Sequence, residues 1–387
     1  MLKKTRPPDA QELRIAMLGY GFMGRCHTNA YRVIPFFYPE AHINPRLLIL
    51  CGQQEDNLER EAARFGFEEF GNDWKEVVAD PRVDLFDNCG PDPIHPEPCI
   101  AALKNGKHVL CEKPLALSLD AARQMRDAAA SAKGKALCVF NYRFMPAVRF
   151  AKDLIDSGKL GTIYNFRVSY QQYYGHDSSL TPAHLWYCSG ARSGILQGIG
   201  SHAIDQGRFL VGEIKSVSSL VRTFHPERAL PTVGCEGVTA DEATVSILEF
   251  QNGAVGVMEA SGVAPGRKNF LSWEINASKG SLRWDLEHPN SLFACLSDVG
   301  DCTLRGFTEI SVTDPSHPYA GKFWGPGHNL GWEQGHLLEK YHIIDALAHG
   351  KPLSPFNATF EDGYRNVAII YAMRESSRTG KKVELVW

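Results

Sequence analysis

The stretch Gly19-Tyr20-Gly21-Phe22-Met23-Gly24 decides the fold of the first part of this 387-residue chain. It follows the apolar run from Arg14 to Leu18, which is typical of a buried parallel strand, and a helix can begin directly after it, from His27 to Val33. The start of such a helix offers N–H groups and the positive end of a dipole to a phosphate. The stretch therefore predicts a dinucleotide site that includes Phe22 and Met23, and the alternative is an ordinary glycine-rich turn.

The three glycines of this stretch have separate roles in such a site. Gly19 permits the tight turn after the strand, Gly21 lets a pyrophosphate approach the backbone, and Gly24 lets the helix pack closely on the strand. The strand and helix on either side distinguish this loop from a chance match to the short GxGxxG pattern.

Strand-like and helix-like segments alternate from this loop to about residue 140. Further strands are expected at Leu47–Cys51, Val83–Asn88, His108–Cys111 and Ala136–Phe140, and helices at Leu58–Phe65, Trp74–Val78, Glu97–Lys104 and Leu119–Ala132. Alternation of this kind favours a parallel sheet with helices on both faces. We therefore predict an α/β Rossmann domain, with a doubly wound parallel sheet, over residues 1–140.

Residues 141–387 follow a different pattern and predict a second, α+β domain. Strand-like runs cover Ile163–Tyr174, Ser216–Phe224, Ala243–Phe250, Ala254–Gly262 and Phe270–Ala277. Short turns such as Gln251-Asn252-Gly253 favour antiparallel connections. We expect a large, mostly antiparallel open sheet that binds substrate and forms oligomers, with the C-terminal helices, Leu337–Ala348 and Phe360–Arg378, packing back on the first domain.

The composition excludes several classes of protein. Lys and Arg number 41 and Asp and Glu 44, so the formal net charge of −3 does not suit a nucleic-acid or membrane-surface protein. No apolar run approaches the length of a membrane span, and the charged start from Met1 to Pro8 lacks the apolar stretch of a secretory signal. The ten cysteines show neither CxxC spacing nor a zinc pattern, and Cys51, Cys89, Cys111 and Cys138 read as buried hydrophobes. We expect a cytoplasmic protein without a metal.

Three motifs resemble the Gfo/Idh/MocA oxidoreductases, the family of glucose–fructose oxidoreductase and inositol dehydrogenase. They are the glycine stretch, Gly106-Lys107-His108-Val109-Leu110-Cys111-Glu112-Lys113-Pro114, and Gly200-Ser201-His202-Ala203-Ile204-Asp205. The resemblance runs from about residue 13 to the end of the chain. The segment Phe323-Trp324-Gly325-Pro326-Gly327-His328 is also similar to a branch that acts on pyranosides.

The resemblance implies roles for the matching residues. Lys113 would contact the substrate hydroxyl and stabilise the developing alkoxide, in a corner set by Pro114 through a cis bond. His202 would accept the hydroxyl proton as hydride leaves for the nicotinamide. The alternatives are a solvated loop lysine for Lys113 and a helix histidine bonded to Asp205 for His202.

One position departs from the family pattern. Many relatives carry an aspartate four residues before the histidine, where this chain has Gly198. Glycine can neither orient an imidazole nor take a proton, so another residue must supply the contact if one is needed. Tyr142, Asp205 and His328 are the candidates, with Tyr142 also a candidate catalytic group.

The cofactor is expected to be NAD, with NADP not excluded. The position after the second strand, where NAD enzymes usually place an acid on the ribose, holds Gln53, which can bond ribose hydroxyls without repelling a 2′-phosphate. Pro91, His95 and Glu112 follow strands at the carboxyl edge of the sheet and are further candidate cofactor contacts. For His95 the equal alternative is turn formation or helix capping.

Residues that could bind a sugar are spread along the second half of the chain. The candidates are Lys113, Tyr142, Arg143, Trp186, Arg192, His202, Asp205, Trp324 and His328. A hinge aromatic is the alternative for Tyr142, core packing for the tryptophans and a solvated surface residue for Arg192.

These observations favour an NAD-dependent oxidation of a secondary hydroxyl, at C3 of a sugar or glycoside. An NAD-dependent glycosidase, which oxidises C3 transiently, eliminates the aglycone and adds water, is the first alternative, and a non-catalytic sugar sensor is the second. Apolar strand positions suggest a homodimer or homotetramer through the second domain. They are Val245, Ile247, Leu248, Val255 and Val257.

Overall fold

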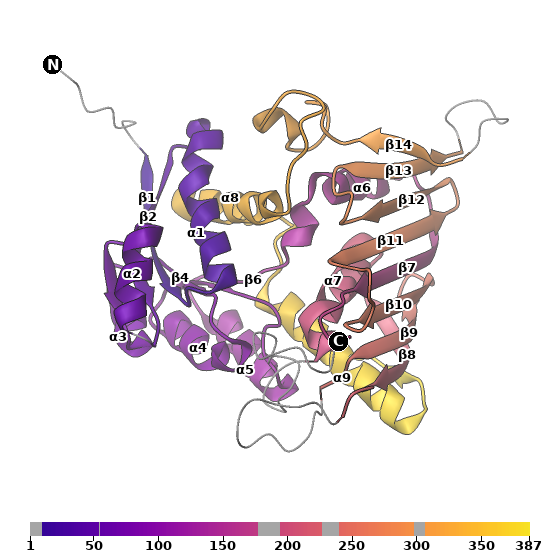
Figure 1. The fold of residues 1–387 in the computed structure, drawn as a ribbon, viewed down its shortest axis with the longest axis horizontal. Coiled ribbons are helices and arrows are strands. Elements are labelled where there is room, and N and C mark those ends of the chain that lie inside the picture. Colours follow the sequence, from indigo (N-terminus) through magenta and orange to yellow (C-terminus); the bar gives the residue numbers. More distant parts are fainter. Residues whose placement is uncertain (1–9, 54, 177–193, 227–239, 298–305) are drawn as a thin grey trace. The chain divides into compact units, whose positions relative to one another are not determined.

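The structure is a computed structural model that describes residues 10–53, 55–176, 194–226, 240–297 and 306–387 (Figure 1). The chain forms two compact units. The first contains Met1–Leu115, Asp120–Phe144 and Trp332–Asp362, and the second contains Ala116–Leu119, Met145–Gly331 and Gly363–Trp387. Each unit is described by itself below.

The first unit contains a six-stranded parallel sheet in the order β3-β2-β1-β4-β5-β6. Its strands are β1 (Gln11–Leu18), β2 (Ile43–Cys51), β3 (Glu69–Gly71), β4 (Leu85–Asn88), β5 (His108–Cys111) and β6 (Ala136–Cys138). The predicted Rossmann sheet is confirmed. Strand β3 is not predicted, because its three residues are exposed or half-buried and form no apolar run.

The helices of this unit are α1 (Phe22–Phe37), α2 (Glu55–Phe65), α3 (Trp74–Ala79), α4 (Pro96–Lys104), α5 (Leu119–Ser131) and α8 (Glu333–His349). Helix α8 packs on α1 and on β1 and β2, and it buries Leu337, Leu338, Ile343 and Ile344. The expected domain boundary is corrected here. The segment Trp332–Asp362 belongs with the Rossmann unit, because α8 completes the packing around α1.

The second unit contains a nine-stranded sheet in the order β14-β13-β12-β11-β7-β10-β9-β8-β15. Its strands are β7 (Ile163–Gln171), β8 (Ile214–Arg222), β9 (Ala243–Phe250), β10 (Val255–Ser261), β11 (Phe270–Ala277), β12 (Gly280–Asp285), β13 (Ser291–Leu296), β14 (Thr308–Ser311) and β15 (Val383–Glu384). The pair β7–β10 is parallel and the other neighbours are antiparallel. The predicted large, mostly antiparallel sheet is confirmed.

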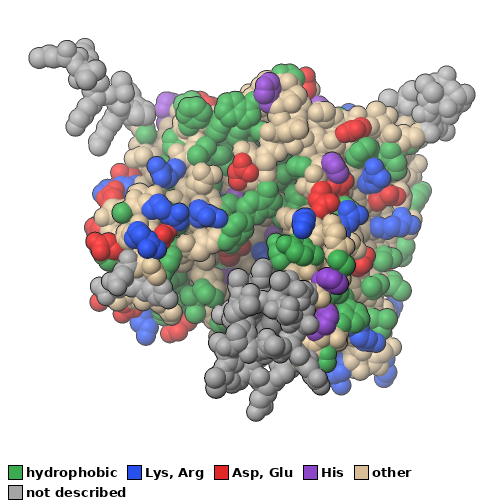
Figure 2. Space-filling model, viewed as in Figure 1, with side chains coloured by type: hydrophobic (Ala, Val, Ile, Leu, Met, Phe, Trp, Pro, Cys, Tyr) green, Lys and Arg blue, Asp and Glu red, His purple; other side chains and the backbone are tan. Residues whose placement is uncertain are grey.

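One face of this sheet is covered and the other is open. Helices α6 (Pro146–Asp156) and α7 (Ser201–Leu210) pack on it, and α9 (Phe360–Thr379), which joins this unit from Gly363 onward, contributes hydroxyls that bind the backbone of β8. The opposite face exposes Val245, Ile247, Val255 and Val257, and hydrophobic patches interrupt the charged surface of the molecule in Figure 2. Leu248 was wrongly expected on this face: it is fully buried, because adjacent strand residues point to opposite sides.

Candidate active site

The glycine loop has the backbone that a dinucleotide site needs. Gly19 has φ +98°, and a Cβ there would lie 2.6 Å from the carbonyl oxygen of Cys89. A Cβ on Gly24 would collide with the carbonyl of Gly19, whereas the space around Gly21 is open. Helix α1 begins at Phe22 with Gly21 as its N-cap and without a side-chain cap, so the loop presents backbone N–H groups to this open space. The residues fit a pyrophosphate.

A pocket of about 340 Å³ lies at the ends of β1 and β2. Gln53 lines this pocket together with Asn72, Asp73 and Lys75. Asp73 caps helix α3 by accepting the Lys75 N–H at 2.8 Å. Burial, with a contribution from the Asp73 charge, raises the pKa of Cys51 at the end of β2 to about 12. The sequence has no acid directly after the second strand, and the structure places an exposed carboxylate, Asp73, in the same pocket as Gln53.

Lys113 lies in a rigid loop at the end of β5. The Lys113–Pro114 peptide bond is cis, as expected, and the lysine is half-buried. The side chain of His95 contacts this loop. Its ring is fully buried, with Nδ1 2.9 Å from the carbonyl oxygen of Pro114 and Nε2 3.1 Å from that of Gly90. The sequence suggested His95 as a cofactor contact, but both nitrogens of its ring face backbone carbonyls and so join two loops at the carboxyl edge of the sheet. Pro91, in the loop that contains Gly90, is exposed.

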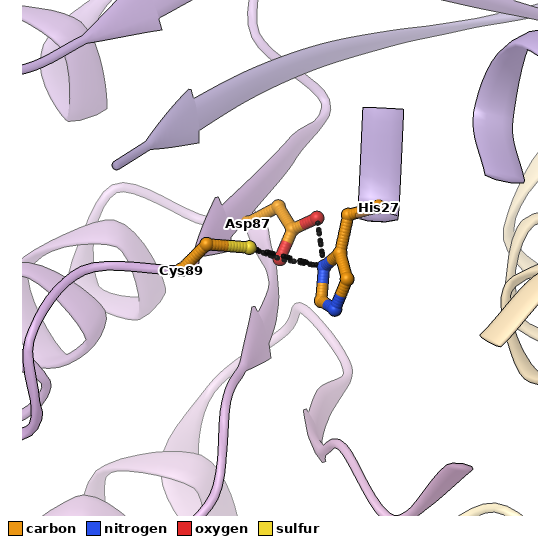
Figure 3. Close-up of side chains that lie close together, drawn as sticks. All are labelled: His27, Asp87 and Cys89. Atoms are coloured by element: carbon orange, nitrogen blue, oxygen red, sulfur yellow. Dashed lines mark hydrogen bonds and ion pairs between the residues drawn. The ribbon is translucent and has the colours of Figure 1, made fainter. Parts of the chain in front are cut away.

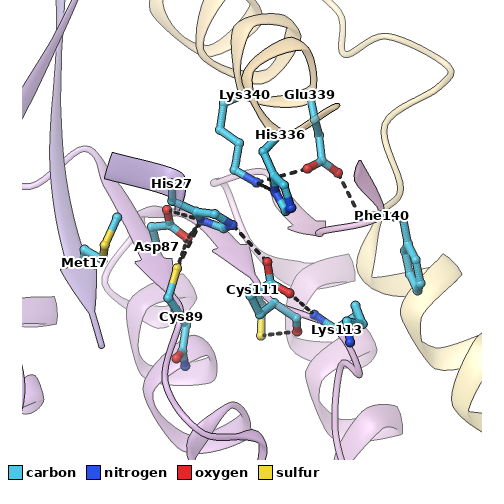
Figure 4. Close-up of polar contacts among 12 residues, drawn as sticks. Met17, His27, Asp87, Cys89, Cys111, Lys113, Phe140, His336, Glu339 and Lys340 are labelled. Carbon is cyan, nitrogen blue, oxygen red and sulfur yellow. Dashed lines mark hydrogen bonds and ion pairs between the residues drawn. The ribbon is translucent and has the colours of Figure 1, made fainter. Parts of the chain in front are cut away.

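A buried cluster of charged side chains lies beside these loops (Figures 3 and 4). The ring of His27, on α1, lies between two carboxylates: Nδ1 is 2.9 Å from Oδ2 of Asp87 and Nε2 is 2.9 Å from Oε1 of Glu112. Tyr31 donates its hydroxyl to Asp87 at 2.9 Å, and the thiol sulfur of Cys89 is 3.1 Å from His27 Nδ1. Glu112, expected to contact the cofactor, instead points into this cluster.

Helix α8 supplies the rest of the cluster (Figure 4). The Lys340 ammonium lies 3.0 Å from Oε2 of Glu339 and 3.4 Å from Nδ1 of His336. The other oxygen of Glu339 accepts the backbone N–H of Phe140 at 2.8 Å, just past the end of β6. Sequence reasoning missed this cluster, and its one local signal was an aspartate, Asp87, inside the apolar strand β4.

The neighbours of each group decide its charge. Burial alone would lower the pKa of His27, but the charge of Asp87 and the hydrogen bonds that both carboxylates accept from the ring outweigh it and leave that pKa raised. Burial would raise the pKa of Asp87 and of Glu112, yet His27 and the Lys340 charge hold both below their usual values. Burial does raise the pKa of Glu339. The contacts place the His27 ring between two carboxylates and the Lys340 ammonium against a third, that of Glu339.

Two groupings within the described residues have the spacing of metal ligands. They are His27–Asp87–Cys89 and His27–Glu112–His336. The distances of 2.9 Å between His27 and each carboxylate are those of direct hydrogen bonds, and the Lys340 ammonium already supplies a cation among these groups. We therefore interpret the cluster as a network of ion pairs.

The second unit holds the other predicted catalytic residue. His202 lies on α7 with 7% of its surface exposed, and its ring centroid is 6.0 Å from that of Tyr170. Asp205, one turn further along the helix, is 1% exposed. Gly198 lies in a π-helical turn, Leu196–Gly200, directly before this helix. Such a turn is frequent at functional sites.

The side chain of Gln197, next to Gly198, forms hydrogen bonds with Leu117 and Arg374. Its amide donates to the carbonyl of Leu117 at 2.9 Å, and its oxygen accepts from Arg374 at 3.4 Å. Arg374 in turn pairs with Asp241 at 2.7 Å. Gln197 therefore does not replace the missing aspartate.

The remaining candidates separate into structural and accessible residues. Arg143 is buried, donates to the carbonyl of Phe356 at 3.3 Å and lies 3.5 Å from Asp362, so its guanidinium holds the chain together instead of reaching a substrate as expected. The hydroxyl of Tyr142 accepts the indole N–H of Trp332 at 3.1 Å.

Trp332 also stacks on Phe22 at the start of α1, with ring centroids 5.4 Å apart, so that Tyr142 belongs to an aromatic chain that ends at the glycine loop. In the second unit, Trp324 is 51% exposed, and the exposed His328 is engaged through Nδ1 with the carbonyl of Gly325 at 2.8 Å. Trp186 and Arg192 lie outside the described residues.

Comparisons with known proteins agree with this architecture. A family model described as an oxidoreductase family with an NAD-binding Rossmann fold matches residues 13–140, and a GFO/IDH/MocA C-terminal domain matches residues 148–283. Levoglucosan dehydrogenase of Pseudarthrobacter phenanthrenivorans is 34% identical over 382 residues, which cover 95% of this chain and 96% of that protein. The NAD⁺-dependent scyllo-inositol 2-dehydrogenase of Bacillus subtilis is 27% identical over 97% of this chain and 96% of its own.

Solved structures show the same relationship. A levoglucosan dehydrogenase in complex with NADH and levoglucosan superimposes with a TM-score of 0.92 at 34% identity, over 97% of this chain and all of the other. An oxidoreductase domain protein from Kribbella flavida has a TM-score of 0.91 at 36% identity, with the same coverage. Within the part of the chain that the structure describes, no helix combines the length and the apolar character that crossing a membrane requires.

Proposed function

This chain belongs to the Gfo/Idh/MocA oxidoreductases, and from that premise we propose that it oxidises a secondary hydroxyl, at C3, of a pyranose sugar or glycoside with NAD. When bound, NAD accepts the hydride. The glycine loop with Phe22 and Met23 would hold the pyrophosphate, and Gln53 in the adjacent pocket would hold the adenosine ribose.

The observation that carries the proposal is the placement of Lys113. The lysine follows β5 at the carboxyl edge of the sheet, the edge at which Rossmann domains bind their ligands, in a loop fixed by Pro114 and His95. A charged ammonium at this point lowers the free energy of a developing alkoxide. His202 of the second unit would take the hydroxyl proton, and we propose that both act on the same substrate hydroxyl.

Net oxidation is favoured over the two alternatives. The relatives described above are dehydrogenases of levoglucosan and of an inositol, which supports a dehydrogenase over a glycosidase. The identity extends along almost the entire length of both chains, and Lys113 and His202 are both present, which supports an enzyme over a sugar sensor.

Turnover of levoglucosan and of a panel of pyranosides with NAD tests the proposal. We expect NADH to form in proportion to the oxidised sugar. Release of aglycone without net NADH would identify a glycosidase instead. His202→Asn should lower kcat by about a hundredfold to ten-thousandfold, the usual contribution of a general base. His288→Asn, an exposed histidine on the second unit, is the matched control and should keep parental turnover.

We further propose that the open face of the nine-stranded sheet joins copies of this chain into a homodimer or a dimer of dimers. Val245, Ile247, Val255 and Val257 form adjoining apolar positions on β9 and β10, each 46–60% exposed. Contiguous exposed apolar surface is typical of interfaces. Light scattering should show a dimer or larger species, and Ile247→Lys should shift it toward monomer; a monomeric parent protein would contradict the proposal.

A further inference from the structure

Glu112 uses its two carboxylate oxygens for two different partners. One oxygen lies 2.9 Å from Nε2 of His27, and the other accepts the backbone N–H of Lys113 at 3.1 Å. Because only 4% of Glu112 is exposed, water offers no easy replacement for either partner. The backbone of Lys113 is therefore tied to whatever holds this carboxylate.

The ring of His27 holds the Glu112 carboxylate. The ring is fully buried, and its other nitrogen is 2.9 Å from the carboxylate of Asp87. A neutral imidazole has only one N–H, so both ring nitrogens can donate to carboxylates only when His27 is an imidazolium. Each carboxylate also keeps a donor other than His27: Tyr31 for Asp87 and the Lys113 amide for Glu112.

Titratable groups from every element packed around His27 bear on its charge. They are Cys26 and Tyr31 of α1, Asp87 and Cys89 at β4, Glu112 after β5, and His336, Glu339 and Lys340 of α8. The Lys340 ammonium opposes an imidazolium, but it lies against Glu339, an acid of its own helix. The two acids bonded to His27 therefore dominate the charge of its ring.

We propose that His27, as an imidazolium, is a positioning residue for Lys113: it fixes the Glu112 carboxylate, which in turn fixes the backbone amide of Lys113 at the carboxyl edge of the sheet. The inference deepens the proposed function and rests on it only for its kinetic readout. It assigns His27 no contact with substrate or cofactor.

Loss of the His27 proton has a defined consequence. One of the two carboxylates then faces an imidazole lone pair instead of a donor, in a buried site. If Glu112 turns away, the Lys113 amide loses its acceptor and the lysine loses its fixed orientation. Because displacement of a reacting group by about 1 Å can cost about a hundredfold in rate, turnover should fall at alkaline pH.

Nuclear magnetic resonance of ring-labelled histidine tests the charge without any assay of turnover. The protein with NAD bound is compared with His27→Gln, which identifies the His27 signals by their loss. In the parent we expect both ring nitrogens of His27 to remain protonated at neutral pH. In Glu112→Gln the amide can still accept the Lys113 N–H while donating to a neutral ring, so the His27 signals should become those of a neutral imidazole. A neutral His27 in the parent at neutral pH overturns the proposal.

Hydrogen exchange and kinetics test the link to Lys113. In Glu112→Ala the Lys113 amide should exchange faster, and kcat should fall by about tenfold to a hundredfold while the KM for NAD stays close to parental. Glu112→Gln should recover much of this kcat and lose the alkaline fall that the parent shows. A purely structural role for Glu112 would lower thermal stability without moving the pH profile, and parental exchange in Glu112→Ala would overturn the proposal.

The control is Asp84→Asn, which removes a partly buried carboxylate of the same unit that pairs with Arg14 and has no contact with Lys113. It should leave Lys113 exchange, kcat and the pH profile parental. Failure of the parent to oxidise any tested sugar would count against the proposed function, whereas the state of His27 and the exchange of Lys113 would still decide this inference.

Discussion

Both ends of the six-stranded sheet pair basic side chains with carboxylates, but the pairs are partly exposed at the amino end and buried at the carboxyl end. At the amino end, Arg14 pairs with Asp84 at 2.7 Å, with about a third of each side chain exposed, and Arg82 pairs with Asp80 at 2.7 Å. At the carboxyl end, the ring of His27 and the carboxylate of Asp87 are fully buried. Water can replace a lost partner at the first end but not at the second. The comparison teaches that burial, more than pairing itself, determines how strongly one charge dictates the state of another.

Strand β5 gives the sharpest form of this comparison, because a lysine flanks each end. Lys107 precedes the strand and donates to the carbonyl of Asp80 at 2.6 Å, and Lys113 follows it. We expect Lys113→Met to lower kcat by about a hundredfold to ten-thousandfold, since the group would be lost from the proton-transfer site, with NAD binding retained. Lys107→Met should keep parental turnover. The measurement is steady-state kinetics with calorimetric titration of NAD, and near-parental turnover of Lys113→Met would contradict the proposed mechanism.

The next largest effect is a loss in the free energy of unfolding. It compares two matched substitutions on one segment of chain, Asp87→Asn and Asp84→Asn. Asp87→Asn leaves His27 with one carboxylate in a dry site, and breaking a buried pair costs roughly 3–5 kcal/mol. Asp84→Asn breaks a partly exposed pair and should cost about 1 kcal/mol or less. Urea unfolding of the two variants measures the difference. Equal losses would show that burial does not separate the two ends.

The pH dependence of stability should also distinguish the ends. The pKa of His27 is raised, so its contribution is complete below the usual histidine value and is lost as pH rises through the folded value. The pKa values of Asp87, Glu112 and Asp84 are lowered, so their contributions exist above the usual carboxyl values and are lost as pH falls.

Both ends should therefore contribute less to the free energy of unfolding in acid. Only the carboxyl end contains His27, whose contribution is lost as pH rises. Unfolding free energies measured over a pH series should fall on the alkaline side with a slope of up to about 1.4 kcal/mol per pH unit for one proton. His27→Gln should remove this slope, and Asp84→Asn should keep it. An unchanged alkaline slope in His27→Gln would assign it to another group.

The same contrast explains which features the sequence predicts. The glycine loop follows from local backbone chemistry, so neighbouring residues suffice to find it, whereas the Lys113–Pro114 corner is implied by the family resemblance. His27, Asp87 and Lys340 lie far apart in the chain, and each fits an ordinary helix or strand position. The packing of α8 on the first unit agrees with the expectation, but α9 belongs to the second unit from Gly363 onward, which differs from the expectation because an apolar helix face does not say which sheet it covers. Leu248 is buried although the neighbouring Ile247 is exposed, because successive strand residues point to opposite faces of the sheet.

The smallest expected effect is on cofactor preference, and it concerns Asp73, an exposed carboxylate at the carboxyl edge of the sheet. Asp73 follows β3 at this edge, but it is exposed, and it shares a pocket with Gln53. If its carboxylate faces the ribose, it disfavours the 2′-phosphate of NADP. Two charges about 4 Å apart interact by about 1 kcal/mol in water, so the discrimination lost in Asp73→Asn should be about fivefold. Asparagine still caps α3, which keeps the fold unchanged.

The ratio of kcat/KM for NADP to that for NAD should rise by this factor in Asp73→Asn, and the rise should shrink at high salt because the charges are exposed. Glu76→Gln removes an acid from the same short helix outside the pocket and is the matched control. A ratio that does not change would place the Asp73 carboxylate away from the ribose. A change far above fivefold would mean that an exposed charge at this edge acts as strongly as a buried one, and burial would then not distinguish the two ends of the sheet.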